Sequence, residues 1–308
     1  MLRRIKWAYA LYNIFKYKKL KHNTALYKSL GLRKWYFSPI SSRDFKKLDV
    51  SNKREVDAKA LERSAIFESI DRDSQLSLQQ YDENGYAILK SYISKEKVDE
   101  INNKIDGLLA SGEIKFRYGN KLMFAIHHSE ILRSIARDPK LTELLDILLD
   151  GKSTLFQSIN FLKGSEQKSH SDSVHMTTYP LGGLLGVWIA LEDIDAENGG
   201  LHYYPGSHKL PYYLNSDYDN EGTWLMLGKY DYTAYEAMIE AKIQQHGIEK
   251  KVFNAKAGDV LIWHANLLHG GEAHTDTSRT RKSMVFHYFD KNSICYHEIT
   301  QRPALMRF

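Results

Sequence analysis

Two side chains with one residue between them, His170 and Asp172, could form half of a metal site. On an extended strand, residues i and i+2 leave the same face about 7 Å apart, so an imidazole and a carboxylate there could grip one ion. A second histidine would complete a set of two imidazoles and one carboxylate, which is typical of non-haem Fe(II) oxygenases. His269, which directly precedes two glycines well downstream, supplies it. We therefore predict His170, Asp172 and His269 as metal ligands.

An arginine follows His269 at the start of another predicted strand. Alternation within residues 281–289 (RKSMVFHYF) places Arg281 and His287 on one face. A guanidinium there could hold a carboxylate through two parallel hydrogen bonds. Arg279 has the same parity and is a rival. We favour Arg281 because the strand continues from it, whereas Arg279 lies in the polar turn.

Most of the thirteen histidines lack a context of this kind. Only His170 stands two residues from an acid on a predicted strand, and only His269 precedes Gly-Gly with an arginine downstream. His264 is placed on the same strand as His269 at an odd separation, so alternation points it to the opposite face. His208 lies in a glycine-containing turn, and we expect a structural role for it.

Taken together, these motifs resemble the phytanoyl-CoA dioxygenase family of Fe(II)/2-oxoglutarate-dependent oxygenases. The resemblance rests on HSD at 170–172, on ENGGLHYYPGSHK at 197–209, and on the pairing of His269 with Arg281. It covers roughly residues 76–292. It implies a mainly β fold with flanking helices, built as a double-stranded β-helix (a cupin-like jelly roll) with the metal at one open end.

The resemblance also implies a chemistry. In such a site 2-oxoglutarate chelates the Fe(II), its far carboxylate meets Arg281, and O2 takes the last open position. Succinate and CO2 are released, and a nearby C–H bond is oxidised. Halogenating relatives replace the acid of the HxD motif with a small residue, so the presence of Asp172 favours hydroxylation or a related oxidation.

Three further residues are candidates for the cosubstrate pocket. Lys121 and Trp188 match positions that family members place near 2-oxoglutarate, although a surface lysine or a core tryptophan would fit the same pattern. Gln157, and with it Asn160, lies on a strand predicted at 153–163 beside the HxD strand, and either amide could reach the cosubstrate or serve as a structural hydrogen-bonder.

One position departs from the family pattern. Gly271 stands two residues beyond His269, where the family often has a serine that helps to bind 2-oxoglutarate. The spacing from His269 to Arg281 is also about one residue longer than usual. The affinity for the cosubstrate could therefore be lower.

Composition sets the frame for these motifs. The chain has 308 residues, of which 43% are hydrophobic, and its twenty Tyr and twelve Phe against six Pro favour strands. A single cysteine, Cys295, cannot form an internal disulfide, so we expect a cytoplasmic protein. We found no base-reading motif and expect no nucleic-acid partner.

The N-terminal part differs from the rest of the chain. Residues 1–47 are rich in Lys and Arg and contain one acid, Asp44. We predict a helical arm and linker over 1–75 and the oxygenase domain over 76–308. Lysines at 16 and 18 interrupt the first apolar stretch, so neither a signal peptide nor a spanning helix is expected.

The helix predicted within residues 2–20 places Ile5, Ala8, Tyr12 and Phe15 on one face. This face could pack on the main domain. Alternatively, the basic helix could lie on an anionic membrane surface and make the protein peripheral at the inner membrane face.

Two questions stay open on the sequence alone. An insert at 211–250 contains a probable helix, which could be a lid over the site or mere decoration. The chain could be an oxygenase acting on a small-molecule, lipid or saccharide substrate, or a catalytically inactive jelly-roll protein that binds a metal or ligand. The intact ligand set and Arg281 favour the oxygenase.

Overall fold

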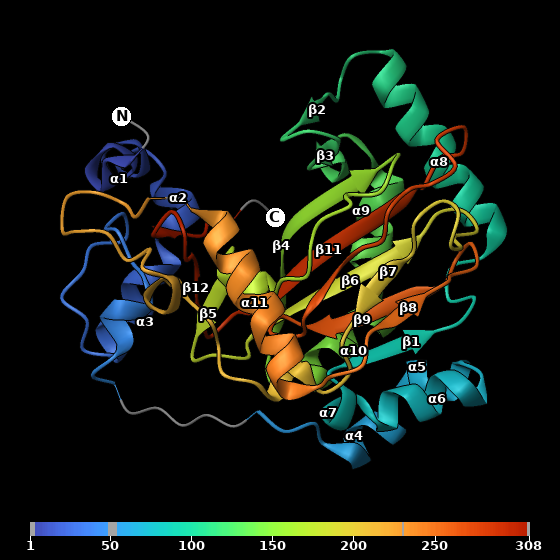
Figure 1. Cartoon of the computed structure of the whole chain (residues 1–308), viewed down its shortest axis with the longest axis horizontal. Helices are drawn as coiled ribbons and strands as arrows, with labels where there is room; N and C mark the ends of the chain where they lie inside the picture. Colours follow the sequence, from blue (N-terminus) through green and yellow to red (C-terminus); the bar gives the residue numbers. More distant parts are fainter. Residues whose placement is uncertain (1–3, 49–53, 230, 307–308) are drawn as a thin grey trace.

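The computed structural model describes residues 4–48, 54–229 and 231–306. Figure 1 shows a large twisted sheet with helices on one side and two smaller sheets across from it. All strand pairs are antiparallel. The predicted mainly β architecture with flanking helices is confirmed.

The largest sheet has seven strands in the order β1 (Tyr86–Leu89), β9 (Val260–His264), β6 (Leu184–Ala190), β11 (Ser283–Asp290), β4 (Ser153–Phe161), β3 (Lys121–Met123) and β2 (Phe116–Arg117). A second sheet contains β10 (His269–Gly271), β7 (Leu201–Tyr203) and β8 (Lys251–Phe253). A third contains β13 (Arg302–Pro303), β12 (Ile294–His297) and β5 (Thr177–Tyr179).

Strand β11 lies in the middle of the large sheet, between β6 and β4, and every residue in it is buried. Alternation sends its side chains to two different places. Met284 and Phe286 enter the main hydrophobic core. Val285 and His287 point to the other face of the sheet, where they line a cavity. One strand therefore contributes to both the core and the cavity wall.

Helices cover the outer face of the large sheet. Helix α8 (Lys95–Ala110) is capped by Ser94, whose hydroxyl accepts a hydrogen bond from the Lys97 amide. Helices α9 (Glu130–Ala136) and α10 (Pro139–Leu148) follow, and Pro139 opens the second of them. Their apolar stripes join the core of the sheet.

Short helices α4 (Ala58–Glu62), α5 (Ala65–Ser69), α6 (Arg72–Gln79) and α7 (Tyr81–Asn84) lead into β1. Leu61, Ile66 and Phe67 lie in the same core cluster as the sheet. The division of the chain at residue 75 stays a prediction, but the side chains from 61 onward share the core of the main domain.

The arm consists of α1 (Lys6–Ile14), α2 (Tyr17–Leu20), α3 (His22–Ser29) and the loop after them. It packs on the third sheet, where the Phe45 ring stacks on Tyr179 with centroids 4.1 Å apart and Tyr27 is buried beside them. The Ser42 hydroxyl donates to the buried Glu298 carboxylate at 2.7 Å. The arm is thus attached to the third sheet and its surroundings through its later residues.

The expectation that the arm packs through Ile5, Ala8, Tyr12 and Phe15 is wrong. Ala8, Tyr12 and Phe15 are exposed. The buried side of α1 carries Lys6, Ala10 and Asn13 instead. Small and polar side chains allow the helix to lie close to the loop at 224–227, to which it is joined by main-chain hydrogen bonds such as Lys6 N to Leu225 O.

Candidate metal and cosubstrate site

The structure brings His170, Asp172 and His269 together. One potential ligand atom of each lies within 4.8 Å of the others, and all three residues are buried. The Asp172 Oδ1 and His269 Nε2 atoms are 3.8 Å apart. Main-chain hydrogen bonds of 2.9 Å in both directions between His170 and His269 join the two distant segments. Two imidazoles and one carboxylate at this separation form a donor set that fits a ferrous ion.

The local backbone differs from the predicted strand. His170 makes only an isolated bridge with His269, and Asp172 opens a single turn of 3-10 helix, Asp172–Val174. The side chains still converge because Ser171 between them is extended. Strand β4 was expected beside this segment, but it pairs with β3 and β11.

The second histidine also lies on a different strand from the one predicted. Strand β9 ends at His264, and His269 begins β10 in the second sheet. The chain therefore changes sheet between the two residues, so alternation along one strand does not relate them. His264 nevertheless lies outside the cavity lining, as expected.

Main-chain carbonyls orient both histidine ligands. The His170 Nδ1 lies 2.8 Å from the Lys168 carbonyl, and the His269 Nδ1 lies 2.9 Å from the Leu267 carbonyl. Only a protonated Nδ1 can donate to a carbonyl, so the proton belongs on that nitrogen in each ring. Each Nε2 is then left with a lone pair for a metal ion.

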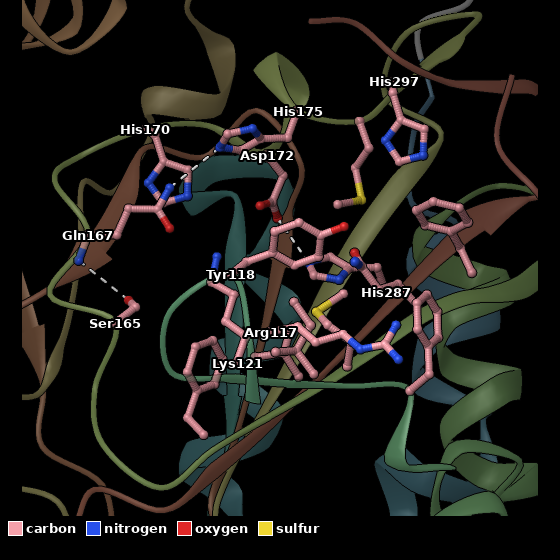
Figure 2. Close-up of a pocket in the computed structure, with 18 of the residues that line it drawn as sticks. Arg117, Tyr118, Lys121, Ser165, Gln167, His170, Asp172, His175, His287 and His297 are labelled. Atoms are coloured by element: carbon pink, nitrogen blue, oxygen red, sulfur yellow. Dashed lines mark hydrogen bonds and ion pairs between the residues drawn. The ribbon is translucent and has the colours of Figure 1, made fainter. Parts of the chain in front are cut away.

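Two side chains contact the second carboxylate oxygen of Asp172, Oδ2. The Trp263 indole Nε1 donates to Asp172 Oδ2 at 2.8 Å, and the His287 Nε2 lies 3.5 Å from the same oxygen. Burial by itself would raise the pKa of Asp172, but His269, His287 and His170 outweigh it and hold the pKa well below the usual range. The carboxylate is therefore ionised and fixed in orientation (Figure 2).

Trp263 fits this place because its neighbour on β6 is a glycine. A side-chain carbon at Gly186 would lie 2.3 Å from the Trp263 ring. Any larger residue at position 186 would therefore displace the indole.

Arg281 lies in the same cavity and is 3% exposed. Its Nε donates to the Gly199 carbonyl at 3.0 Å, and its guanidinium carbon lies 5.6 Å from the centre of the Trp188 ring. Burial lowers the pKa of Arg281 to about 10, which leaves it charged at neutral pH. None of the described acidic residues forms an ion pair with it. Such a buried cation is suited to an anionic ligand.

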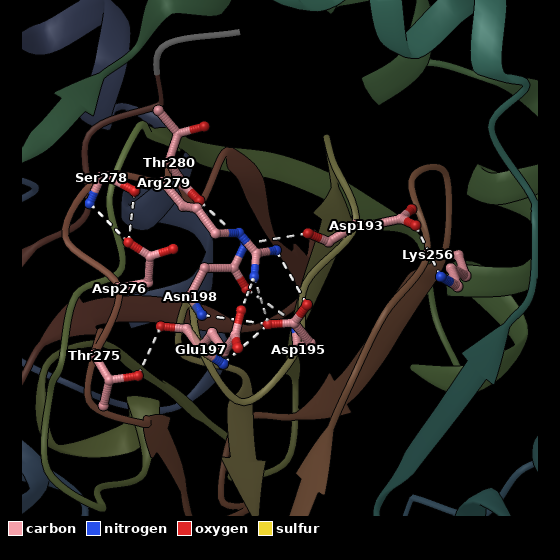
Figure 3. Close-up of polar contacts among 10 residues, drawn as sticks. All are labelled: Asp193, Asp195, Glu197, Asn198, Lys256, Thr275, Asp276, Ser278, Arg279 and Thr280. Carbon is pink, nitrogen blue, oxygen red and sulfur yellow. Dashed lines mark hydrogen bonds and ion pairs between the residues drawn. The ribbon is translucent and has the colours of Figure 1, made fainter.

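The rival Arg279 has acidic partners outside the cavity. Figure 3 shows its guanidinium between Asp195 and Glu197. It contacts both Asp195 oxygens at 3.0 and 3.1 Å and Glu197 at 3.0 Å. It does not line the cavity. The geometry therefore favours Arg281 for a carboxylate inside.

The cavity has a volume of about 530 Å³ and receives three of the other predicted residues, Lys121, Gln157 and Trp188. A one-residue register shift between β4 and β11 turns Phe156 as well as Gln157 inward. Burial lowers the pKa of Lys121, although Asp172 opposes this shift. Asn160 is buried on the other face of β4 and does not line the cavity, so the expectation that it could reach the cosubstrate is wrong.

Ser165 lies where the family serine would point. A side-chain carbon at Gly271 would lie 3.2 Å from Ser165 Oγ and 3.0 Å from the Glu166 amide nitrogen. Ser165 lines the cavity and is labelled in Figure 2. Ser165, which comes from another segment, therefore places a hydroxyl next to the position that a serine side chain at 271 would occupy.

The insert supports the HxD segment from outside. On α11 (Tyr232–His246), the Tyr235 hydroxyl accepts a hydrogen bond from the Ser171 amide at 3.1 Å. Tyr232 Oη lies 3.1 Å from His175 Nε2, and burial lowers the pKa of His175 to about 4. Among the described residues of 211–250, none lines the cavity. The geometry therefore favours structural support of the HxD segment by the insert over a lid or a segment without a role at the site.

Sequence reasoning missed Trp263, Ser165 and the part played by His287. Alternation had placed His287 on the face of Arg281, which is a usable signal for a residue near the ligands. Trp263 and Ser165 carry no local signal, because the first depends on a contact between distant segments and the second lies in an irregular loop.

Comparisons with known proteins agree with this site. A family model described as phytanoyl-CoA dioxygenase matches residues 81–283, which include the three ligands and Arg281. Phytanoyl-CoA dioxygenase domain-containing protein 1 of Mus musculus is 40% identical over 94 residues, or 29% of this chain and 32% of that protein. The Danio rerio protein of the same name is 29% identical over 179 residues, or 56% and 58%. The alignments thus span about a third to three fifths of these relatives.

Solved structures show the same architecture. The carbocyclase SnoK from nogalamycin biosynthesis, described as non-haem and α-ketoglutarate-dependent, superposes with a TM-score of 0.60 at 19% identity, covering 74% of this chain and 87% of that one. EctD from S. alaskensis, solved with 2-oxoglutarate and 5-hydroxyectoine, gives 0.54 at 20% identity, covering 79% and 85%. The predicted jelly roll is confirmed. Because its family model spans most of the domain and all of the site, the chain belongs to the phytanoyl-CoA dioxygenase family.

Proposed function

We propose that this family member is an Fe(II)/2-oxoglutarate-dependent dioxygenase in which His170, Asp172 and His269 hold the iron and Arg281 binds the cosubstrate. The observation that carries the proposal is a buried set of three candidate ligands in the same cavity as a buried guanidinium that has no acidic partner among the residues described. With 2-oxoglutarate and O2, bound Fe(II) would supply oxidation of a substrate C–H bond, with release of succinate and CO2.

The residues of the cavity favour one binding orientation of 2-oxoglutarate. Its keto acid end would be held at the metal ligands and its far carboxylate by Arg281, where Trp188 flanks the guanidinium. Ser165 is placed to donate a further hydrogen bond near that end. Because Arg281 is desolvated, an ion pair there is stronger than it would be in water.

The side chains that contact Asp172 determine which of its oxygens can bind the metal. Trp263 and His287 occupy Oδ2, so that Oδ1 is the oxygen left to face the ion. Partners of this kind fix a metal ligand's orientation and raise metal affinity. The buried walls exclude water from the oxidising centre.

Hydroxylation of an unactivated C–H bond in a small-molecule, lipid or saccharide substrate is the reaction we propose. The retained Asp172 supports it, because the carboxylate fills the position that a halide would need. The proposed setting is the cytoplasm, with peripheral contact at the inner face of a membrane. Among the helices of the described residues, none is long and apolar enough to cross a bilayer.

Succinate formation tests the proposal. Protein supplied with Fe(II), 2-oxoglutarate and O2 should release succinate, and a screen of candidate metabolites should find one that increases the rate. Binding of metal and 2-oxoglutarate without any succinate, under all of these conditions, would instead favour the inactive binding protein.

A further inference from the structure

Helix α1 turns its apolar side away from the protein. Trp7 and Leu11 follow one another at four-residue spacing, and Phe15 continues the row just past the end of the helix. They are 44%, 63% and 84% exposed. The inward side carries Lys6 and Asn13, which are buried. This is the reverse of an ordinary helix on a soluble domain.

The exposed apolar surface continues onto neighbouring segments. The Tyr36 hydroxyl donates to the Ile14 carbonyl at 2.8 Å, and its ring meets that of Tyr17 at 5.2 Å. Phe37 contacts Tyr36 on one side and the largely exposed Trp35 on the other. A continuous chain of aromatic rings therefore runs from the end of α1 to Trp35.

A third segment joins at the start of α1. Trp224 is 77% exposed and precedes Leu225, whose carbonyl accepts a hydrogen bond from the Lys6 amide. We call this surface the α1 face and define it by Trp7, Leu11, Phe15, Tyr17, Trp35 and Trp224. It holds three of the five tryptophans of the chain. Apolar patches of this kind on a soluble protein mark interaction sites.

Basic residues accompany the α1 face. Lys18, Lys19 and Lys21 are exposed on and beside α2. None of them forms an ion pair with a described acidic residue. Asp44, the one acid of residues 1–47, is paired with Lys34 at 2.9 Å, and the nearby Glu221 is paired with Arg43 and Lys46. The surface is therefore both aromatic and positively charged.

The same helix forms part of the cavity wall. Tyr12 and Asn13 of α1 line the cavity that holds the predicted metal ligands. Arg302, whose guanidinium lies 4.6 Å from the centre of the Tyr9 ring of α1, lines it as well. The mouth of the cavity thus opens beside the α1 face.

We propose that the α1 face docks on an anionic lipid surface and presents a membrane-embedded, amphipathic substrate to the mouth of the cavity. The delivery step rests on the proposed function of the site. Exposed Trp and Tyr suit the interface between headgroups and acyl chains, and lysines suit anionic headgroups.

Two other occupants fit less well. Lysine is depleted where proteins contact one another, which argues against a protein partner. A second copy, docked through the same face about a twofold axis, would bring the lysines of one subunit against those of the other. A lipid surface meets both the aromatic and the charged side chains.

Vesicle co-sedimentation tests the docking. The full-length chain should sediment with vesicles of equal parts phosphatidylcholine and phosphatidylglycerol, and weakly with pure phosphatidylcholine. Serine at Trp7, Leu11 and Phe15 together should reduce the bound fraction about tenfold or more. The matched control replaces Leu76 and Val252, which are exposed elsewhere, with serine and should sediment like the wild type.

The outcomes separate the alternatives. The triple variant should keep its melting temperature and its basal succinate formation, because the replaced side chains contact solvent and lie outside the cavity lining. Unchanged sedimentation of the triple variant, equal binding to neutral vesicles, or a wild-type dimer that the triple variant abolishes would each overturn the docking. A wild type that sediments but forms no succinate would support the docking and overturn the proposed function.

Discussion

The two ends of the cavity are built differently. At the inner end, strands β6, β9 and β11 and the HxD segment supply buried side chains that are held by named partners, as Asp172 is held by Trp263. At the outer end, helix α1 and the β2–β3 hairpin supply exposed ones, such as Tyr12 and Tyr118. Figure 2 shows Arg117 and Tyr118 of the hairpin together with the inner histidines.

This difference separates two tasks. Side chains on paired strands, packed on both sides, keep the precise geometry that a metal centre needs. Loops, hairpins and appended helices tolerate change and therefore commonly determine which substrate is taken. We infer that the inner end is responsible for the reaction and that the outer end selects the substrate. Substitutions at the two ends should then fail in different ways.

Removing a ligand at the inner end should have the largest effect. Asp172→Ala deletes the one anionic ligand, so succinate formation should fall by about a thousandfold or more, together with the bound iron. Turnover and iron content after anaerobic loading measure it. Asp99→Ala, on the exposed side of α8, is the control. Wild-type turnover in the Asp172 variant would remove the basis of the assigned ligand set.

Two arginines near each other in sequence offer a matched pair. Arg281→Ala should raise the KM for 2-oxoglutarate roughly 10- to 100-fold, since a buried charge-assisted hydrogen bond contributes about 1.5–3 kcal/mol. Arg279→Ala removes two ion pairs, with Asp195 and Glu197, that lie outside the cavity, and it should change KM little. Steady-state kinetics with varied 2-oxoglutarate decide between them, and the reverse order would assign the cosubstrate to Arg279.

The partner behind Asp172 should matter less than the ligand itself. Trp263→Phe keeps an aromatic ring, although a smaller one, but removes the N–H that donates to Oδ2, and iron affinity should fall by about 10- to 100-fold. Gly186→Ala should mimic it by displacing the indole. Iron titration measures both variants. If both bind iron like the wild type, Asp172 is oriented by something other than Trp263.

The same contrast explains how far the sequence could predict the structure. His170, Asp172, His269 and Arg281 could be selected as candidates because residue type and local sequence context carry their signal. The structure brings them into one cavity, and their roles stay a prediction. The local strand around His170 was predicted wrongly, since its conformation depends on a bridge to His269 far along the chain. The local periodicity of a sequence does not reveal which remote segments will pair through their main chains.

The arm shows a different limit. Helical periodicity within residues 2–20, of which 2 and 3 lie outside the described residues, grouped Ile5, Ala8, Tyr12 and Phe15. The exposed apolar row in the structure is instead Trp7, Leu11 and Phe15, and periodicity could not say which side would face the protein. That orientation depends on the loop at 224–227 and on the third sheet, against which the arm packs. The sequence predicted a single helix, whereas the described residues form α1 and α2, with Phe15 exposed between them and Asn13 buried.

The smallest expected effect concerns pH and a buried histidine at the end of β9, outside the cavity lining. Burial, reinforced by His208 and Arg54, lowers the pKa of His264 to about 3. Its Nδ1 accepts a hydrogen bond from the Asn266 amide at 3.1 Å, which requires the neutral ring on that side. In the unfolded chain the ring takes up a proton below its ordinary pKa of about 6.5.

The folded state resists this protonation. The stabilising contribution of His264 is therefore complete above about pH 6.5 and is lost as the pH falls toward 3. Between pH 7.5 and 5.0 this amounts to at most about 2 kcal/mol, or several degrees of melting temperature.

His264→Gln should lose less stability over that interval than the wild type, because its amide oxygen can accept the same hydrogen bond without titrating. His246→Gln, on the exposed end of α11, should behave like the wild type. If the melting temperatures of all three proteins fall by the same amount between pH 7.5 and 5.0, His264 is not the source of the acid sensitivity.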